Sequence, residues 1–190
     1  MAKNPQSYRA HYNLGNAYKN QDNVEKAIKH YYFTIIIRPA HAKAHNNLGN
    51  ILKQRGNLNK ALFQYQKALD IDQDVPATHY NLGNLMLLNN DLDNASYHYN
   101  QAISLDAYYA KAHNNLGIVM ARLHKVEDAM SHFTEAVRIE PDYIDALLNL
   151  GRAHLLKNNK NVACKHFRQV LKIDPDYSIT KKELLINCKF

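Results

Sequence analysis

The sequence has little of what several protein classes depend on. Its 190 residues include only two cysteines, Cys164 and Cys188, which are too few for a disulfide framework and lack the spacing of a structural zinc site. A reducing compartment is therefore the expected environment. No apolar run approaches the roughly 18 residues that cross a bilayer, and the opening residues 1–7 lack the apolar stretch of a signal peptide. We therefore predict a cytoplasmic chain without a membrane segment.

Motifs of common catalytic sites are also missing. The chain contains no glycine-rich phosphate loop, no Gly-x-Ser-x-Gly nucleophile turn and no His-Glu-x-x-His zinc motif. Its carboxylates stand mostly at the ends of repeats and in expected turns, as solvated capping residues do. We therefore predict that the protein is not an enzyme and has no cofactor.

Composition favours a folded chain with a modest basic excess. Hydrophobic residues make up 46% and charged residues 22%, close to the averages of soluble globular proteins, so composition suggests neither disorder nor a fibrous class. The formal charge of +7 is compatible with an acidic partner. However, basic residues outnumber acidic residues in both halves of the chain, and they form no basic tail.

The glycines reveal a repeat. Five of the six glycines lie 34 residues apart, and a leucine precedes each of them. These glycines are Gly15, Gly49, Gly83, Gly117 and Gly151. A fixed period of this size indicates stacked supersecondary repeats. With the glycine as the eighth residue, the repeats are 8–41, 42–75, 76–109, 110–143 and 144–177.

Each repeat is predicted to contain two helices. Apolar residues recur at helical spacing in two stretches that polar breaks such as Asn89-Asn90-Asp91 separate. Alanine stands at position twenty and an aromatic residue at position twenty-four of every repeat. Small residues at positions eight and twenty let two helices approach closely, and the aromatic ring fills the groove beside them. Pro39, Pro141 and Pro175 at position thirty-two are expected to end second helices.

This pattern resembles the tetratricopeptide repeat family, which has Leu-Gly at positions seven and eight, alanine at twenty, an aromatic residue at twenty-four and proline at thirty-two. The resemblance implies an all-α fold, a right-handed α-solenoid of five repeats and ten helices. Residues 178–190 are predicted to form a C-terminal capping helix, with Ser178 as its N-cap. Residues 1–7 look like the remnant of an upstream repeat or an N-terminal tail, as in a segment of a longer protein.

In this family the first helices line a concave groove, and asparagine dominates the groove positions here. Positions six and nine together supply Asn13, Asn16, Asn47, Asn50, Asn81, Asn84, Asn115 and Asn149. A carboxamide both donates and accepts hydrogen bonds, so this ladder could pair with the backbone of an extended peptide. It resembles the ladder in the superhelical repeat domain of O-linked N-acetylglucosamine transferases. The alternative is that the amides bond only to neighbouring helices.

The other groove residues predict the ligand's character. Lys43 and Lys53 make the first part of the groove basic, whereas Leu87, Leu88 and Leu155 make the later part apolar. The predicted function is a non-catalytic scaffold that binds an extended peptide segment with acidic and apolar portions. Self-association through an exposed end of the array is a further possibility, because an uncapped repeat exposes apolar surface.

Other functions compete with this prediction. Related helical arrays read single-stranded RNA, although no regular basic rung follows each repeat here. The chain could also be the substrate-recruiting segment of a larger glycosyltransferase. The carboxylate clamp of heat-shock cochaperones matches only in part. His11, His45, His79 and His113 at position four depart from the family pattern, but neighbouring repeats stand about 10 Å apart, so these histidines cannot share a metal ion.

Overall fold

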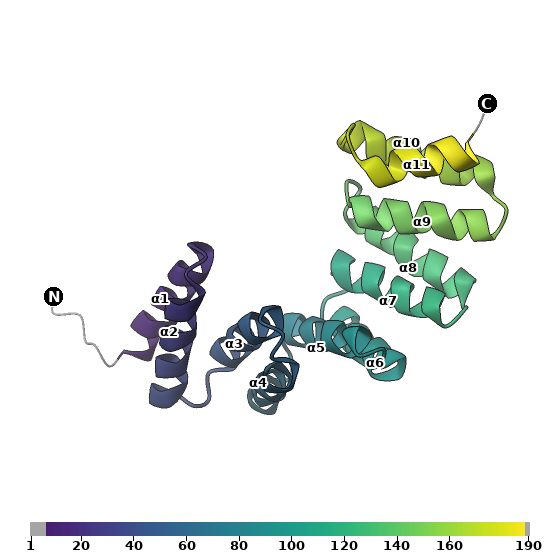
Figure 1. Cartoon of the computed structure of the whole chain (residues 1–190). Helices are drawn as coiled ribbons and strands as arrows, with labels where there is room; N and C mark the ends of the chain where they lie inside the picture. Colours follow the sequence, from purple (N-terminus) through teal and green to yellow (C-terminus); the bar gives the residue numbers. More distant parts are fainter. Residues whose placement is uncertain (1–6, 189–190) are drawn as a thin grey trace. The chain divides into compact units, whose positions relative to one another are not determined.

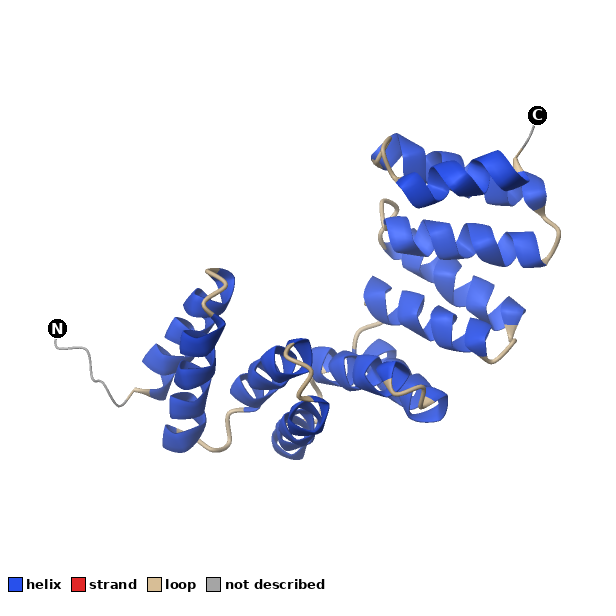
Figure 2. Cartoon of the chain, in the orientation of Figure 1, coloured by secondary structure: helices blue, strands red, loops and turns tan. Residues whose placement is uncertain are grey.

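The computed structural model describes residues 7–188, in which all regular structure is helical (Figures 1 and 2). The helices are α1 (Tyr8–Asn20), α2 (Val24–Ile37), α3 (Ala42–Gln54), α4 (Leu58–Ile71), α5 (Pro76–Leu88), α6 (Leu92–Leu105), α7 (Ala110–Arg122), α8 (Val126–Ile139), α9 (Ile144–Leu156), α10 (Lys160–Ile173) and α11 (Ser178–Asn187). The first helix of each repeat begins at the residue where the glycine period starts that repeat. The all-α class of five two-helix repeats with a C-terminal helix is confirmed.

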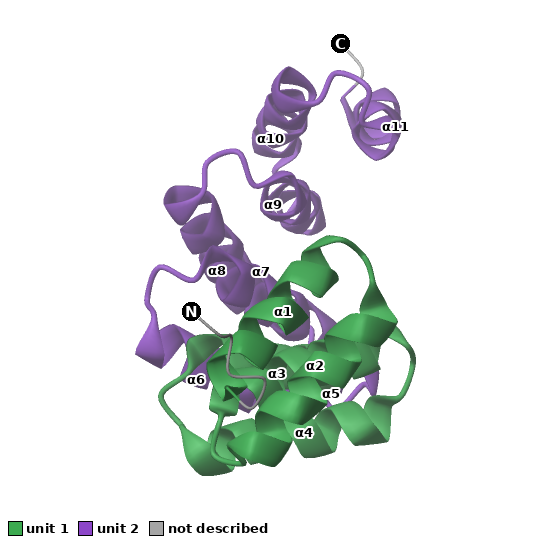
Figure 3. Cartoon of the chain, turned by 90° about the vertical axis from the view of Figure 1, so that its left-hand side faces the viewer, with its two compact units in different colours: residues 1–85 green, residues 86–190 purple. Residues whose placement is uncertain are grey.

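The chain divides into two compact units, residues 1–85 and residues 86–190 (Figure 3). The boundary falls within α5, between Leu85 and Met86. In the N-terminal unit, α1 packs on α2, α2 on α3 and α3 on α4. In the C-terminal unit, each helix from α6 to α10 packs on the next one in the chain. Contacts between consecutive helices are what a linear array of repeats requires.

The predicted glycine and aromatic positions meet inside the first, second, fourth and fifth repeats. Tyr65 of α4 is fully buried, and a Cβ atom placed on Gly49 of α3 would lie 2.7 Å from its Cε1 atom. The same geometry recurs in the fourth repeat, where a Cβ on Gly117 would lie 2.6 Å from Cε1 of Phe133. Only a residue without a side chain fits against the ring, so the predicted packing role of these positions is confirmed.

A residue with left-handed backbone conformation follows the first helix of every repeat. The residues with positive φ all stand at position fifteen, and they are Asp22, Gly56, Asn90, His124 and Asn158. A left-handed residue after a helix lets the following amides bond back to the last turn. Glycine, asparagine and aspartate tolerate this conformation. In histidine the Cβ atom clashes with the backbone, which raises the free energy of the folded state.

Replacing His124 with glycine is therefore expected to stabilise the protein by about 1 kcal/mol, because the steric cost of φ 58° disappears. Gly56→Ala should destabilise it by about the same amount, since φ is 75° there and a Cβ atom would meet no other atom within 4 Å. Urea unfolding measures both effects. Unchanged midpoints in both variants would contradict a conformational cost at this position.

Helix α11 covers the last repeat as predicted, but two details differ. Tyr177 is the N-cap and Ser178 is the first helical residue, so the prediction of Ser178 as N-cap is wrong. Cys164 and Cys188 form a disulfide, with their Cα atoms 5.9 Å apart, which joins α10 to the end of α11. Two cysteines are too few for a framework of several bonds, yet they suffice for one. The inference of a reducing compartment, which rested on them, loses its basis.

The first repeat leaves apolar surface uncovered. Leu14 at position seven is 42% exposed, whereas Leu48 and Leu116 at the same position are fully buried. Ile36 of α2 is also exposed. This is the surface at which the sequence predicts self-association. Within the described part of the chain, no helix has both the length and the apolar character that crossing a membrane requires.

Candidate functional site

A cavity of about 520 Å³ lies in the N-terminal unit, between the first helices of three consecutive repeats. It gathers four of the predicted site residues, Asn50, Lys53, Asn81 and Asn84, from α3 and α5. The remaining lining residues are Lys19, Asp22, Val24, Ile51, Gln54 and Tyr80. Four of the eight site residues that the sequence predicts in this unit thus line one polar cavity, and the other four do not.

The asparagine ladder makes hydrogen bonds between repeats. Each bond runs from the Nδ2 atom of a position-six asparagine to the Oδ1 atom of an asparagine in the preceding repeat. These bonds are Asn47 to Asn16 at 3.0 Å, Asn81 to Asn46 at 2.9 Å, and Asn149 to Asn114 at 3.0 Å. The alternative interpretation, in which the amides bond to neighbouring helices, is therefore correct for their donor atoms.

In these three asparagines the bonds use the Nδ2 atom and leave the Oδ1 atom able to accept a further hydrogen bond. Among residues 7–188, no donor reaches the Oδ1 atoms of Asn47, Asn81 or Asn149. Asn50 has the opposite orientation, because its Oδ1 atom accepts from the Tyr65 hydroxyl at 2.7 Å. Its Nδ2 atom has no acceptor within the described part of the chain. Asn81 therefore presents an amide acceptor to the cavity, and Asn50 presents an amide donor.

Buried tyrosines fix the orientation of the position-nine amides. The Tyr31 hydroxyl donates to Asn16 Oδ1 at 2.8 Å, just as the Tyr65 hydroxyl donates to Asn50. Burial raises the pKa of Tyr31 to about 12 and raises the pKa of Tyr65 as well, so both hydroxyls keep their protons near neutral pH. A hydroxyl that stays protonated holds the amide oxygen toward the core and the NH2 group outward.

Sequence reasoning missed this coupling, although a signal was present. Tyrosine at position twenty-four occurs in the three repeats that have asparagine at position nine. The fourth and fifth repeats have phenylalanine at position twenty-four, and there Ile118 and Arg152 replace the asparagine. A ring without a hydroxyl cannot orient an amide, so the two positions change together.

Lys53 adds a positive charge that has no ion-pair partner among the described residues. Its side chain is half-buried, and burial lowers its pKa from the ordinary lysine value. No acidic group within residues 7–188 forms an ion pair with it. Lys19 and Asp22 line the same cavity. An incompletely hydrated ammonium group favours the arrival of a carboxylate.

Other predicted site residues lie elsewhere. Lys43 is exposed and lines a separate cavity of about 310 Å³ with Arg38 and Asp72, so it does not join Lys53. Asn13 is exposed, and the Oδ1 atom of Asn115 already accepts from Asn114 at 3.1 Å.

The three leucines predicted to hold an apolar part of the ligand also differ in their surroundings. Leu88 is 65% exposed and Leu87 is half-buried. Leu155 packs against the cluster of Leu148, Ala163 and Phe167, which gives it a structural role.

The position-four histidines have a packing role that explains their departure from the family pattern. Nδ1 of His45 lies 2.7 Å from the side-chain amide of Gln64, and its Nε2 lies 2.9 Å from the Pro39 carbonyl oxygen. In the fourth repeat, Nδ1 of His113 lies 3.3 Å from Nδ1 of His132. Each imidazole thus links the two helices of its repeat. Within residues 7–188, no group of three or more histidine, cysteine or acidic side chains is arranged to hold a metal ion.

Tandem two-helix repeats, with polar side chains presented by the first helices, define a helical-repeat protein. Models of the tetratricopeptide repeat match residues 8–41, 110–143 and 144–177, and a further TPR repeat model matches residues 49–89 and 87–124. The chain belongs to the tetratricopeptide repeat family. Proteins of this family generally bind other proteins and are generally not catalytic.

Solved structures with the same fold are only distantly similar in sequence. YrrB, described as a TPR protein with an unusual peptide-binding site, is 20% identical, with a TM-score of 0.74 over 95% of this chain and 93% of its own. PilF of Pseudomonas aeruginosa is 20% identical, with a TM-score of 0.84 over 91% and 79%. MamA is 22% identical, with a TM-score of 0.74 over 90% and 95%. These identities support the fold alone. No curated protein sequence matches the chain.

Proposed function

We propose that this chain is a non-catalytic scaffold that binds an extended peptide segment of a partner protein in the cavity of its N-terminal unit. The observation that carries the proposal is the combination of an amide donor, an amide acceptor and an unpaired ammonium group in one cavity. The peptide-binding site named for YrrB, a structural relative, supports the same class of ligand.

The mechanism combines backbone pairing with one charged contact. Asn50 Nδ2 donates to a peptide carbonyl oxygen, and Asn81 Oδ1 accepts from a peptide N–H group, whatever the side chains of the ligand. Lys53 binds an acidic side chain of the peptide, which restores the interactions that burial removes from its ammonium group. Asn47 offers the same acceptor in the second repeat, and Lys43, which is exposed in the same unit, contacts a flanking acidic residue of the ligand.

A random twelve-residue peptide library displayed on phage, selected against the immobilised chain, tests this proposal. Selected peptides are expected to be enriched in aspartate or glutamate. Lys53→Met should weaken binding of the best synthetic peptide by about 10- to 100-fold, because a charge-assisted hydrogen bond is lost. Asn81→Ala should weaken it by about 3- to 10-fold, because an uncharged hydrogen bond is lost. Isothermal titration calorimetry gives the affinities.

Lys60→Met is the matched control, because Lys60 is exposed on α4 and does not line the cavity. It should leave peptide affinity unchanged. Asn81→Ala should keep the melting temperature within a few degrees, since Asn46, the partner of Asn81, remains accessible to water. A twelve-residue single-stranded RNA serves as competitor. Displacement of the peptide by RNA, or equal effects of Lys53→Met and Lys60→Met, would contradict the proposal.

A further inference from the structure

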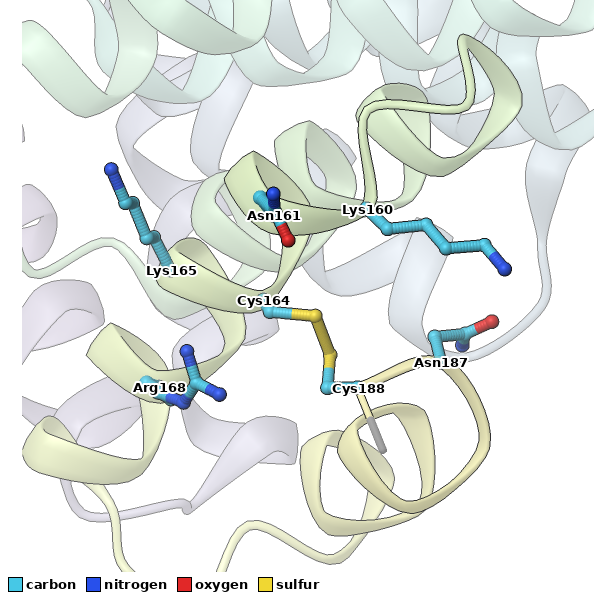
Figure 4. Close-up of a pocket in the computed structure, with 7 residues that line it drawn as sticks. All are labelled: Lys160, Asn161, Cys164, Lys165, Arg168, Asn187 and Cys188. Carbon is cyan, nitrogen blue, oxygen red and sulfur yellow. A yellow bond between two sulfur atoms is a disulfide. The ribbon is translucent and has the colours of Figure 1, made fainter. Parts of the chain in front are cut away.

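A second cavity, of about 530 Å³, lies in the C-terminal unit beside the disulfide (Figure 4). Its lining consists of Lys160, Asn161, Cys164, Lys165, Arg168, Asn187 and Cys188. Three of these side chains are cationic and none is acidic. The cavity is independent of the candidate peptide site, which lies in the other unit.

The helix places positive charge on both sides of the buried cysteine. Lys160 and Arg168 stand four residues before and four residues after Cys164 on α10, so they share its helical face. Figure 4 shows Lys160 on the side of Asn187 and Arg168 on the opposite side, with Lys165 pointing away from the disulfide. Cys164 is only 6% exposed, whereas Cys188 is half-buried, so Cys188 presents the more accessible sulfur atom.

The disulfide secures a helix that has few other attachments. Helix α11 has ten residues, and helices of this length are marginal in water without tertiary contacts. Leu184 and Cys188 pack on the cluster of Leu148, Ala163 and Phe167, and Glu183 pairs with Arg152 at 2.8 Å. Arg152 occupies position nine of the fifth repeat, so α11 covers a residue of the groove face.

We propose that the cationic cavity admits a small anionic thiol of the glutathione class, which exchanges with the Cys164–Cys188 disulfide and releases α11 from α10. A tripeptide thiol with two carboxylates is small enough for a cavity of this volume, and Lys160 and Arg168 attract its negative charge. Release of α11 uncovers Phe167 and Leu148 and frees Arg152.

The exchange proceeds in two balanced steps. The ligand thiolate attacks Sγ of Cys188, the protein disulfide breaks, and Cys164 leaves as a thiolate that the neighbouring cations stabilise before it takes a proton from water. A second ligand thiolate attacks the ligand sulfur of this mixed disulfide, so that Cys188 leaves with the electron pair. Two ligand thiols are thereby oxidised to one disulfide, and the protein disulfide is reduced by two electrons.

The test compares rates of reduction by glutathione and by 2-mercaptoethanol, which has no charge beyond its thiolate. In Lys160→Gln/Arg168→Gln, the ratio of the two rate constants should fall about fivefold or more, because only glutathione loses the attraction of its carboxylates. Slower departure of Cys164 affects both thiols equally and cancels in the ratio. Mass spectrometry after trapping should find the mixed disulfide on Cys188.

Lys172→Gln/Lys182→Gln removes the same charge from α10 and α11 outside the cavity, and its ratio should match that of the unmodified chain. Hydrogen exchange measures the second part of the proposal. Reduction should lower the protection of α11 amides about tenfold or more, and Cys188→Ser should do so without any thiol. An unchanged rate ratio in the cavity variant, or full protection of α11 after reduction, would overturn the proposal.

Discussion

Replacing Gly117 with alanine is expected to destabilise the protein by about 2 to 4 kcal/mol, since overpacking a rigid core costs this much. The added Cβ atom would lie 2.6 Å from Cε1 of Phe133, far inside van der Waals contact. Phe133 is 3% exposed and packs within a cluster that includes Ala129 and Leu150, so the ring has no space into which it can retreat. Urea unfolding followed by circular dichroism measures the loss.

The second-site variant Phe133→Leu separates this clash from a general effect of substituting a helical glycine. Alone, it should destabilise the chain by leaving a cavity. Together with Gly117→Ala, it should cost less than the sum of the two single changes, because the smaller side chain makes room for the new methyl group. Strict additivity of the two changes would show that the ring is not what excludes alanine.

The success of the sequence-based fold prediction has a simple physical origin. Glycine, alanine and the aromatic residue recur because the two helices of each repeat pack together in the same way. The 34-residue period therefore predicts the same contact between the glycine and the aromatic residue in each repeat. The starts of α1, α3 and α9 follow from that period and from the turn before each helix. All of these signals lie within about 34 residues of each other, which is why no knowledge of distant contacts was needed.

The candidate site was less accessible to prediction because its properties depend on contacts between repeats. The two ends of an asparagine are chemically different, but sequence does not say which end faces the groove. That choice at Asn50 depends on the buried Tyr65 hydroxyl. Whether two lysines share a cavity depends on how side chains point, and Lys43 and Lys53 do not share one. The Cys164–Cys188 bond likewise depends on how α11 folds back on α10.

Acidification from pH 7 to pH 5 is expected to lower the melting temperature of the protein. Burial is the first cause that lowers the pKa of seven histidines: His30, His41, His79, His113, His132, His154 and His166. Unfolding restores the ordinary histidine pKa of 6.5. The stabilisation is therefore complete above that pH, and it is lost as the pH falls toward the depressed folded values, because only the unfolded chain takes up protons there.

The second repeat supplies the control for this prediction. Its His45 pairs with Gln64, whereas His113 of the fourth repeat pairs with His132, so His132→Gln converts one arrangement into the other. Besides burial, the backbone of Ala107 and Glu135 raise the pKa of His113, and Arg138 lowers it. The pKa of His132 is lowered by His113 and raised by Asp128. Because these charges remain in the variant, only one titrating imidazole disappears. The variant should lose less stability between pH 7 and pH 5, as judged by thermal melts, with little change at pH 8. An equal loss in both proteins would mean that the paired imidazoles do not govern acid unfolding.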